Sequence, residues 1–281
     1  AGKGTILARQ KNALGQGRAS VMVTGSHIPF DRNGIKFNLK AGEVLKEDEP
    51  GILDRVLEVR SEEYNRPVGE SVFDDKGFFL PNRAQALPPE TPAAREAYLR
   101  RYRDFFPAQG LLGVRVLFYQ HSAVGRDIIT DILRGAGAAV LPVGRSEEFV
   151  PIDTEDISDD RLRDLQCMAD NARGKGAPVD ALVSTDGDSD RPLVCGVRSD
   201  GTLVFLPGDL LGPLVAEFLE ADGVVVPVSG NDAVLEFLSG KVLPQTRIGS
   251  PFVVAGMQDA VAAGRHRVVG YEANGGFLVQ S

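Results

Sequence analysis

The feature that most constrains the fold of this chain is the regular alternation of short apolar runs with longer amphipathic segments. Runs such as VVVPV at 224–228 are apolar throughout, which suits strands that helices cover on both faces of a sheet. Strands that alternate with segments of helical length predict βαβ units and a mainly parallel sheet. The expected strands are 21–24, 114–119, 138–142, 181–184, 224–228 and 268–271, and the expected helices are 47–59, 92–106, 124–135, 159–172, 207–220, 232–238 and 252–263.

Two changes in composition divide the 281 residues into three α/β segments. The stretch NRAQALPPETP at 82–92 is rich in proline and polar residues, and RSDG at 198–201 is a turn signal between two apolar strands. We therefore expect three domains. They are 1–92, 93–199 and 200–281.

Composition excludes several classes of partner. The formal net charge of −8 argues against nucleic acid, because nucleic-acid-binding proteins carry basic surfaces. No apolar run reaches the ~20 residues of a membrane-spanning helix, so no membrane partner is expected. The two cysteines, Cys167 and Cys195, are too few for a disulfide framework and favour reduced thiols in the cytoplasm. A small phosphorylated substrate stays compatible with this composition, whereas the oligomeric state is not indicated.

The first loop with reactive side chains is TGSHIP at 24–29, directly after an apolar strand. It is followed by NGIK at 33–36. Ser26 offers a hydroxyl that can carry a phosphoryl group, and His27 can relay protons near neutral pH. Lys36 is a cation within reach if the Asn-Gly turn folds the chain back. The alternative is an ordinary surface turn in which the Ser-His pair is incidental.

The second loop is DGDSDR at 186–191, again after an apolar strand. The carboxylates of Asp186, Asp188 and Asp190 repel one another unless a cation is present, and hard divalent metals prefer oxygen ligands. Alternate residues of an extended backbone face the same side, so the three can converge on one ion. Arg191 adds a donor for phosphate oxygens. The alternative is a solvated acidic turn.

Two other acidic-loop motifs fit less well. An EF-hand requires Gly at its sixth position and Glu at its twelfth, where this loop has Arg191 and Val197. A nucleophile loop of the haloacid-dehalogenase type also begins Asp-x-Asp, but it requires Thr or Val at the fifth position, where Asp190 stands. A metal loop of a different kind is therefore favoured.

The third loop is EANGG at 272–276, after the apolar run VVGY. Glu272 can accept hydrogen bonds from sugar hydroxyls, and Asn274 can both donate and accept. The two glycines allow a close approach of backbone. Taken alone, this loop is equally well explained as a turn between two elements.

Four further positions are weighed on weaker signals. Arg247 follows a strand and precedes a helix, so it is placed to meet an anion, while Ser250 is expected to cap that helix. His121 and His266 have no ligand pattern around them and are expected to be structural or exposed.

Together the three loops resemble those of the α-D-phosphohexomutase family. TGSHIPFDRNGIK resembles its phosphoserine loop, TDGDSDRP its metal loop and GYEANGG its sugar-specificity loop, in the family's order. The stretch PVSGNDAVLEF, TRIGSPFVVAGM and VVGYEANGG is similar to phosphomannomutases in particular. The resemblance implies consecutive α/β domains with mixed or parallel sheets around a cleft. It also implies that the N-terminal part of the first domain and the whole C-terminal domain are missing from this sequence.

The resemblance further implies a reaction. Phosphorylated Ser26 donates its phosphate to a hexose monophosphate, and the resulting bisphosphorylated sugar turns over and returns its other phosphate. Mg²⁺ is expected on Asp186, Asp188, Asp190 and an oxygen of the Ser26 phosphate, with Arg191 steadying the transferred group. A hexose 1,6-bisphosphate is expected as intermediate and activator.

The same resemblance assigns roles to the remaining residues. His27 and Lys36 are expected to handle proton transfer and phosphate charge. Glu272 and Asn274 are expected to read the 3- and 4-hydroxyls of the sugar, and Arg247 to line the sugar or phosphate site.

Departures from the family pattern keep alternatives open. Ile28 stands where the family often has Asn, and Asn274 where it often has Ser. Mannose phosphate is favoured by the similarity to phosphomannomutases, and the change at Asn274 keeps glucose and glucosamine phosphate as alternatives. Two other classes are a phosphatase with Asp186 or Asp188 as nucleophile, and a sugar-phosphate binder without turnover. Activity that survives Ser26→Ala would favour the phosphatase.

Overall fold

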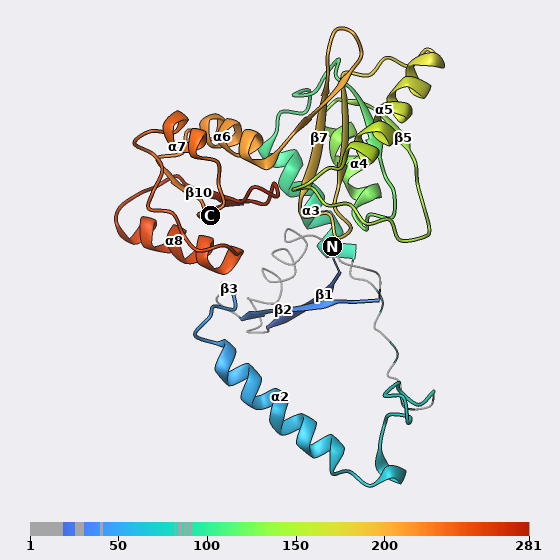
Figure 1. Cartoon of the computed structure of the whole chain (residues 1–281), viewed down its shortest axis with the longest axis vertical. Coiled ribbons are helices and arrows are strands. Elements are labelled where there is room, and N and C mark those ends of the chain that lie inside the picture. Colours follow the sequence, from blue (N-terminus) through green and yellow to red (C-terminus); the bar gives the residue numbers. More distant parts are fainter. Residues whose placement is uncertain are drawn as a thin grey trace.

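A computed structural model of the chain describes residues 19–25, 31–39, 42–81, 83, 86, 89 and 92–280. The described residues form three sheets that follow one another along the sequence (Figure 1). The α/β class predicted from the sequence is thereby confirmed. None of the helices in these ranges is long and apolar enough to cross a membrane.

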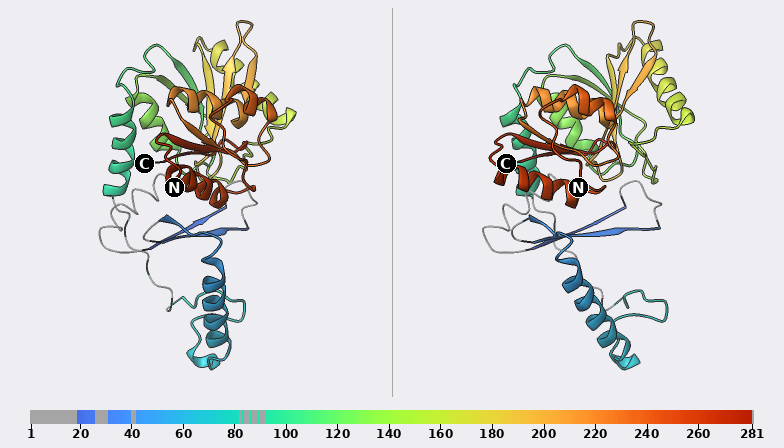
Figure 2. Two further views of the ribbon diagram at one scale, coloured as in Figure 1. Left: turned by 90° about the vertical axis from the view of Figure 1, so that its left-hand side faces the viewer. Right: turned by 60° about the vertical axis from the view of Figure 1, so that its left-hand side comes forward.

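The first sheet is an antiparallel ribbon of short strands. It consists of β1 (Ser20–Thr24), β2 (Gly34–Leu39) and β3 (Gly42–Glu43). After it come the long helix α2 (Glu49–Tyr64) and the 3-10 turn η1 (Val68–Glu70). Helix α2 buries none of its residues and extends away from the other two sheets (Figures 1 and 2).

The second sheet is mixed and has the strand order β5-β4-β6-β7-β8. Strands β5, β4 and β6 run parallel, whereas β7 and β8 return as antiparallel hairpins. Its strands are β4 (Arg115–Tyr119), β5 (Ala139–Val143), β6 (Ala181–Thr185), β7 (Pro192–Val197) and β8 (Leu203–Leu206), and its helices are α3 (Pro92–Phe105), α4 (Arg126–Gly135) and α5 (Asp159–Gly174).

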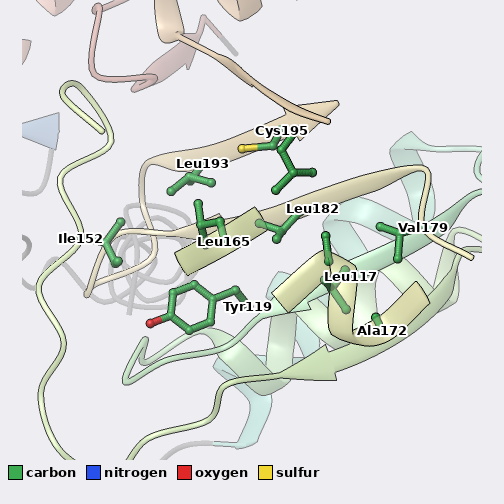
Figure 3. Packing of buried hydrophobic residues seen from close by; sticks show 11 residues of the cluster. Leu117, Tyr119, Ile152, Leu165, Ala172, Val179, Leu182, Leu193 and Cys195 are labelled. Carbon is green, nitrogen blue, oxygen red and sulfur yellow. The ribbon is translucent and has the colours of Figure 1, made fainter. Parts of the chain in front are cut away.

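Both faces of this sheet are covered, which explains why its strands are apolar throughout. In β4, Val116 and Phe118 belong to the cluster that includes Leu133 of α4. Their neighbour Leu117 points to the other face and packs in the cluster of Leu165 from α5 (Figure 3). Each fully buried leucine of this kind stabilises the fold by roughly 1.5–3 kcal/mol relative to an exposed one.

The third sheet repeats this arrangement on a smaller scale, with the order β11-β10-β9. On one face, Val224 packs with Leu238, which directly follows helix α7. On the other face, Val225 packs with Met257 of helix α8. The strands are β9 (Gly223–Val225), β10 (Val268–Tyr271) and β11 (Phe277–Val279), and the helices are α6 (Gly208–Phe218), α7 (Asp232–Phe237) and α8 (Ser250–Ala262).

Strand direction differs in part from the prediction. Every predicted strand overlaps an observed one, but only the pairs β4–β5, β4–β6 and β9–β10 are parallel. The other pairs are antiparallel. For β6–β7, β7–β8 and β10–β11 the reason is a connection of only five or six residues, whereas a parallel pair needs a crossover of a dozen or more.

The predicted boundary between residues 199 and 200 falls in the turn that joins β7 and β8. These strands pair with Val197 opposite Leu203, so the second sheet continues across that boundary. Turn-forming residues at 198–201 mark a hairpin here. The division into 1–92, 93–199 and 200–281 otherwise stays a prediction.

Candidate active site

The acidic loop lies between β6 and β7, at the carboxyl end of β6. One carboxylate oxygen each of Asp186, Asp188 and Asp190 lies within 4.8 Å of the others. A tight turn brings them together: the N–H of Ser189, whose φ of 63° is left-handed, donates to the Asp186 carbonyl at 3.2 Å. The backbone N–H groups of Asp190 and Arg191 donate to Asp186 Oδ1 at 3.2 and 3.3 Å. The Asp186 carboxylate therefore organises the loop.

The carboxylates fit a hard divalent cation. Asp186 and Asp188 are buried, and Asp188 Oδ1 has no hydrogen-bond partner among the described residues. Thr24 Oγ1 donates to the other oxygen, Asp188 Oδ2, at 2.5 Å. Burial raises the pKa of Asp188, but hydrogen bonds with Thr24 and Asp186 and the charge of Lys36 outweigh burial and lower it overall. Clustered, buried carboxylates with a remaining acceptor are the donor set that Mg²⁺ requires.

A loop after β4 holds the acidic loop in place, and sequence reasoning did not identify it. His121 Nε2 lies 2.9 Å from the carbonyl of Thr185, and the ring is fully buried. The N–H of Val124 donates to the Gly187 carbonyl at 3.0 Å, and the N–H of Gly125 donates to Ser189 Oγ at 2.9 Å. We expected His121 to be either structural or exposed, and its buried, hydrogen-bonded ring shows that it is structural.

A cavity of about 550 Å³ joins the predicted loops. Its lining includes Lys36 from β2, Asp190 and Arg191 from the acidic loop, and Glu272 and Asn274 from the β10–β11 loop. Lys36 Nζ lies 4.0 Å from Asp190 Oδ2, and Arg191 Nε lies 4.0 Å from Asp190 Oδ1. Cations, carboxylates and an amide thus face one space, which suits a ligand with both phosphate and hydroxyl groups.

The β10–β11 loop presents Glu272 and Asn274 in a fixed geometry. The N–H of Glu272 donates to the Gly276 carbonyl at 3.0 Å, and Gly275, with φ of 88°, closes the turn. Asn274 Oδ1 accepts from the Gly276 N–H at 2.9 Å, whereas the side-chain NH2 group supplies two donors. Thr154 Oγ1 donates to the Asn274 carbonyl at 2.7 Å and ties this loop to the second sheet's domain.

Three predicted site residues remain to be accounted for. Ser26 and His27 lie outside the described residues. Arg247 is exposed, and its guanidinium lies 5.8 Å from the centre of the Phe252 ring. In that segment the cavity lining begins at the next residue, Ile248.

The start of α8 also faces the cavity, through Gly249, Ser250 and Pro251. The helix cap is Gly249, with φ of 121°, so the expectation that Ser250 caps the helix is wrong by one residue. Glycine takes this position because side chains disfavour positive φ. The N-terminus of a helix carries a partial positive charge, which adds to the attraction for an anion.

Helix α3 contributes a wall that no loop motif predicted. Tyr98, Arg101 and Tyr102 line the cavity. The sequence signal for them is only their spacing at i, i+3 and i+4 on one helix face.

Comparisons with known proteins show what this chain is similar to. Residues 7–63 match the family model described as phosphoglucomutase/phosphomannomutase, alpha/beta/alpha domain I. A phosphomannomutase of Sinorhizobium fredii strain NGR234 is 43% identical over 265 residues, which are 94% of this chain and 51% of that relative. Over most of its length the chain is similar to members of the α-D-phosphohexomutase family. A phosphomannomutase of Salmonella muenchen is 39% identical over 262 residues, 93% of this chain and 48% of that relative.

A solved phosphohexomutase structure shares the fold. A phosphoglucomutase/phosphomannomutase family protein of Burkholderia thailandensis superposes with a TM-score of 0.62 at 17% identity, covering 93% of this chain and 51% of that one. At this identity the likeness shows the fold alone. The chain spans about half the length of the curated relatives it matches.

Proposed function

We propose that the chain serves the interconversion of hexose 6-phosphate and hexose 1-phosphate through a phosphoserine at Ser26 and a bisphosphorylated sugar. The observation that carries the proposal is the cavity of about 550 Å³, because side chains of β2, the acidic loop and the β10–β11 loop line it together. Mannose phosphate is favoured because the two relatives described above are phosphomannomutases. Glucose and glucosamine phosphate are the alternatives.

In the proposed reaction a sugar hydroxyl oxygen forms a bond to the phosphorus on Ser26 while the bond from phosphorus to the serine oxygen breaks. His27 is our candidate to accept the hydroxyl proton as the new bond forms. Lys36 and Arg191 lie on either side of Asp190 and supply the positive charge that the phosphoryl oxygens need. After the bisphosphorylated sugar has reversed its orientation in the cavity, the same groups act in the return step.

Asp186, Asp188 and Asp190, with an oxygen of the Ser26 phosphate, would hold Mg²⁺. When bound, the ion supplies electrophilic activation of phosphorus and charge for the leaving oxygen. Glu272 and the amide of Asn274 would bind adjacent sugar hydroxyls, which must be presented alike in both orientations. Arg247 is proposed only as a peripheral contact, because the cavity lining begins beyond it. A hexose 1,6-bisphosphate would charge Ser26 at the start.

The decisive experiment is peptide mapping by mass spectrometry after incubation with mannose 1,6-bisphosphate and Mg²⁺. Trypsin releases Ser26 in a peptide that spans 19–32 and also contains Ser20. We expect one phosphoryl group on this peptide. It should disappear in Ser26→Ala and persist in the matched control Ser20→Ala.

A hydrolysis assay and a binding assay, added to the peptide map, separate the competing classes. If Ser26→Ala retains hydrolysis of mannose 1-phosphate, the phosphatase with Asp186 or Asp188 as nucleophile replaces the mutase. If the unmodified peptide is found under all conditions and the sugar phosphate still binds, the chain is a binder without turnover.

A further inference from the structure

Helix α3 brings an aromatic and cationic face to the cavity, outside the three loops. Tyr98 lies one turn before Arg101 and Tyr102 on that face, and all three line the cavity. An ion pair between Arg95 and Asp131 of α4 at 2.5 Å holds the helix against the second sheet's domain. The helix thus contacts α4, and within the described range of α3 Ala94 is the one buried residue.

The two tyrosines are polar neighbours of the acidic loop. Their hydroxyl oxygens lie 3.1 Å apart, and their rings meet edge to face with centroids 5.1 Å apart. Burial raises the pKa of Tyr98, and the charge of Asp190 raises it further, so Tyr98 stays protonated beside the carboxylates. One hydroxyl proton serves the bond between the tyrosines, which leaves the second as a donor for an oxygen in the cavity.

Arg101 is the cation of this face. No carboxylate among the described residues forms an ion pair with it, whereas Arg95 and Arg103 of the same helix pair with Asp131 and Glu96. Its guanidinium lies 5.9 Å from the centre of the Tyr102 ring, which orients it without neutralising it. An arginine of this kind binds phosphate through its planar set of donors.

We propose that α3 forms a binding wall for the hexose phosphate, in which Arg101 contacts a phosphate group and the Tyr98–Tyr102 pair donates to a sugar hydroxyl oxygen. This proposal rests on the proposed function of the cavity and adds three residues of α3 to the binding site. It faces the same space as Glu272 and Asn274, so the sugar is held between the helix and the β10–β11 loop. Arg101 acts together with Lys36 and Arg191, which line the cavity from other elements.

The first test compares two charge-removing variants on the same helix. Dissociation constants for mannose 6-phosphate and for inorganic phosphate are measured by titration calorimetry at fixed ionic strength. Arg101→Gln should weaken both by about tenfold or more, since a hydrogen bond to a charged group contributes roughly 1.5–3 kcal/mol. The adjacent, exposed Arg100→Gln is the matched control and should change either constant less than about twofold.

The second test uses tyrosine emission, which is clean because the chain has five tyrosines and no tryptophan. Mannose 6-phosphate should change this emission in the unsubstituted chain and in Tyr64→Phe, whose residue is exposed on α2. The double variant Tyr98→Phe with Tyr102→Phe should lose most of the change. It should bind mannose 6-phosphate more weakly, yet bind inorganic phosphate as before, because the rings and Arg101 remain.

The outcomes separate the wall from the mutase proposal. Equal weakening by Arg101→Gln and Arg100→Gln overturns the wall, as does a chain that binds neither ligand or a double tyrosine variant that binds mannose 6-phosphate unchanged. A chain that binds through Arg101 but never carries phosphate on Ser26 keeps the wall and removes the mutase.

Discussion

The first and second sheets use similar apolar residues to opposite effect. Val23 in β1 is 64% exposed, while Leu182 in β6 is fully buried. Strand β6 is covered by helices on both faces, whereas the helix that follows the first sheet, α2, buries none of its residues. Figure 1 shows this contrast between the lower and upper parts of the molecule. An apolar strand therefore stabilises the chain only in proportion to the layers packed against it.

The two sheets meet at the acidic loop. Thr24 at the end of β1 and Lys36 in β2 reach Asp188 and Asp190, which the second sheet holds rigidly. The buried sheet thus fixes the position of the charges, and the exposed ribbon adds groups to them. Four predictions test this division, in order of expected effect.

Removing a core side chain should have the largest effect. Leu182→Ala should lower the free energy of unfolding by about 2–5 kcal/mol, because it leaves a cavity in a packed layer. Val23→Ala, the matched change in the first sheet, should lower it by less than about 0.5 kcal/mol. Urea unfolding followed by circular dichroism measures both. Similar losses for the two variants would contradict the contrast between the sheets.

Replacing the buried His121 should have the next largest effect. His121→Leu leaves the Thr185 carbonyl without its donor, which costs about 1–3 kcal/mol, while His121→Gln can restore that bond. The Leu variant should also bind Mg²⁺ more weakly than the Gln variant, as measured by calorimetry. His266→Leu, at an exposed position, should change neither quantity.

The pH dependence of stability follows from the same histidine. Burial lowers the pKa of His121 in the folded state, so the unfolded chain binds a proton more readily. Its contribution to stability is complete above the ordinary pKa of about 6.5 and declines as pH falls below that value toward the folded pKa. The unfolding free energy of His121→Gln should therefore fall less steeply in this acidic range than that of the unsubstituted chain. Parallel slopes would contradict the assignment.

Breaking the contact between the sheets should have the smallest effect. Thr24→Val removes the hydroxyl that donates to Asp188, and the expected loss is about 1.5 kcal/mol, at the lower end of the range for a bond to a charged group. Thr24→Ser keeps the donor and should lose less. Hydrogen exchange should accelerate in β1 and β2 in the Val variant, with little change in β4. Equal acceleration in β4 would mean that the ribbon supports the second sheet as well.

The acidic loop shows how far local sequence carries a prediction. Its carboxylates were identified from their spacing alone, and the structure places them within reach of one ion. The expected order of strands and helices was also recovered, because periodicity and turn residues are local signals. Strand direction was predicted less well, since short turns and long crossovers decide it.

The sequence by itself determined which residues can do chemistry: three loops, each after an apolar strand, with their charges and hydroxyls. The tertiary structure alone decided which of them share a cavity. Lys36, Asp190 and Glu272 converge there, and Arg247 does not. It also brought Tyr98 and Arg101 of α3 to the same cavity. The physical reason is that a motif fixes only short-range geometry, whereas the packing of whole helices and sheets sets which distant side chains meet.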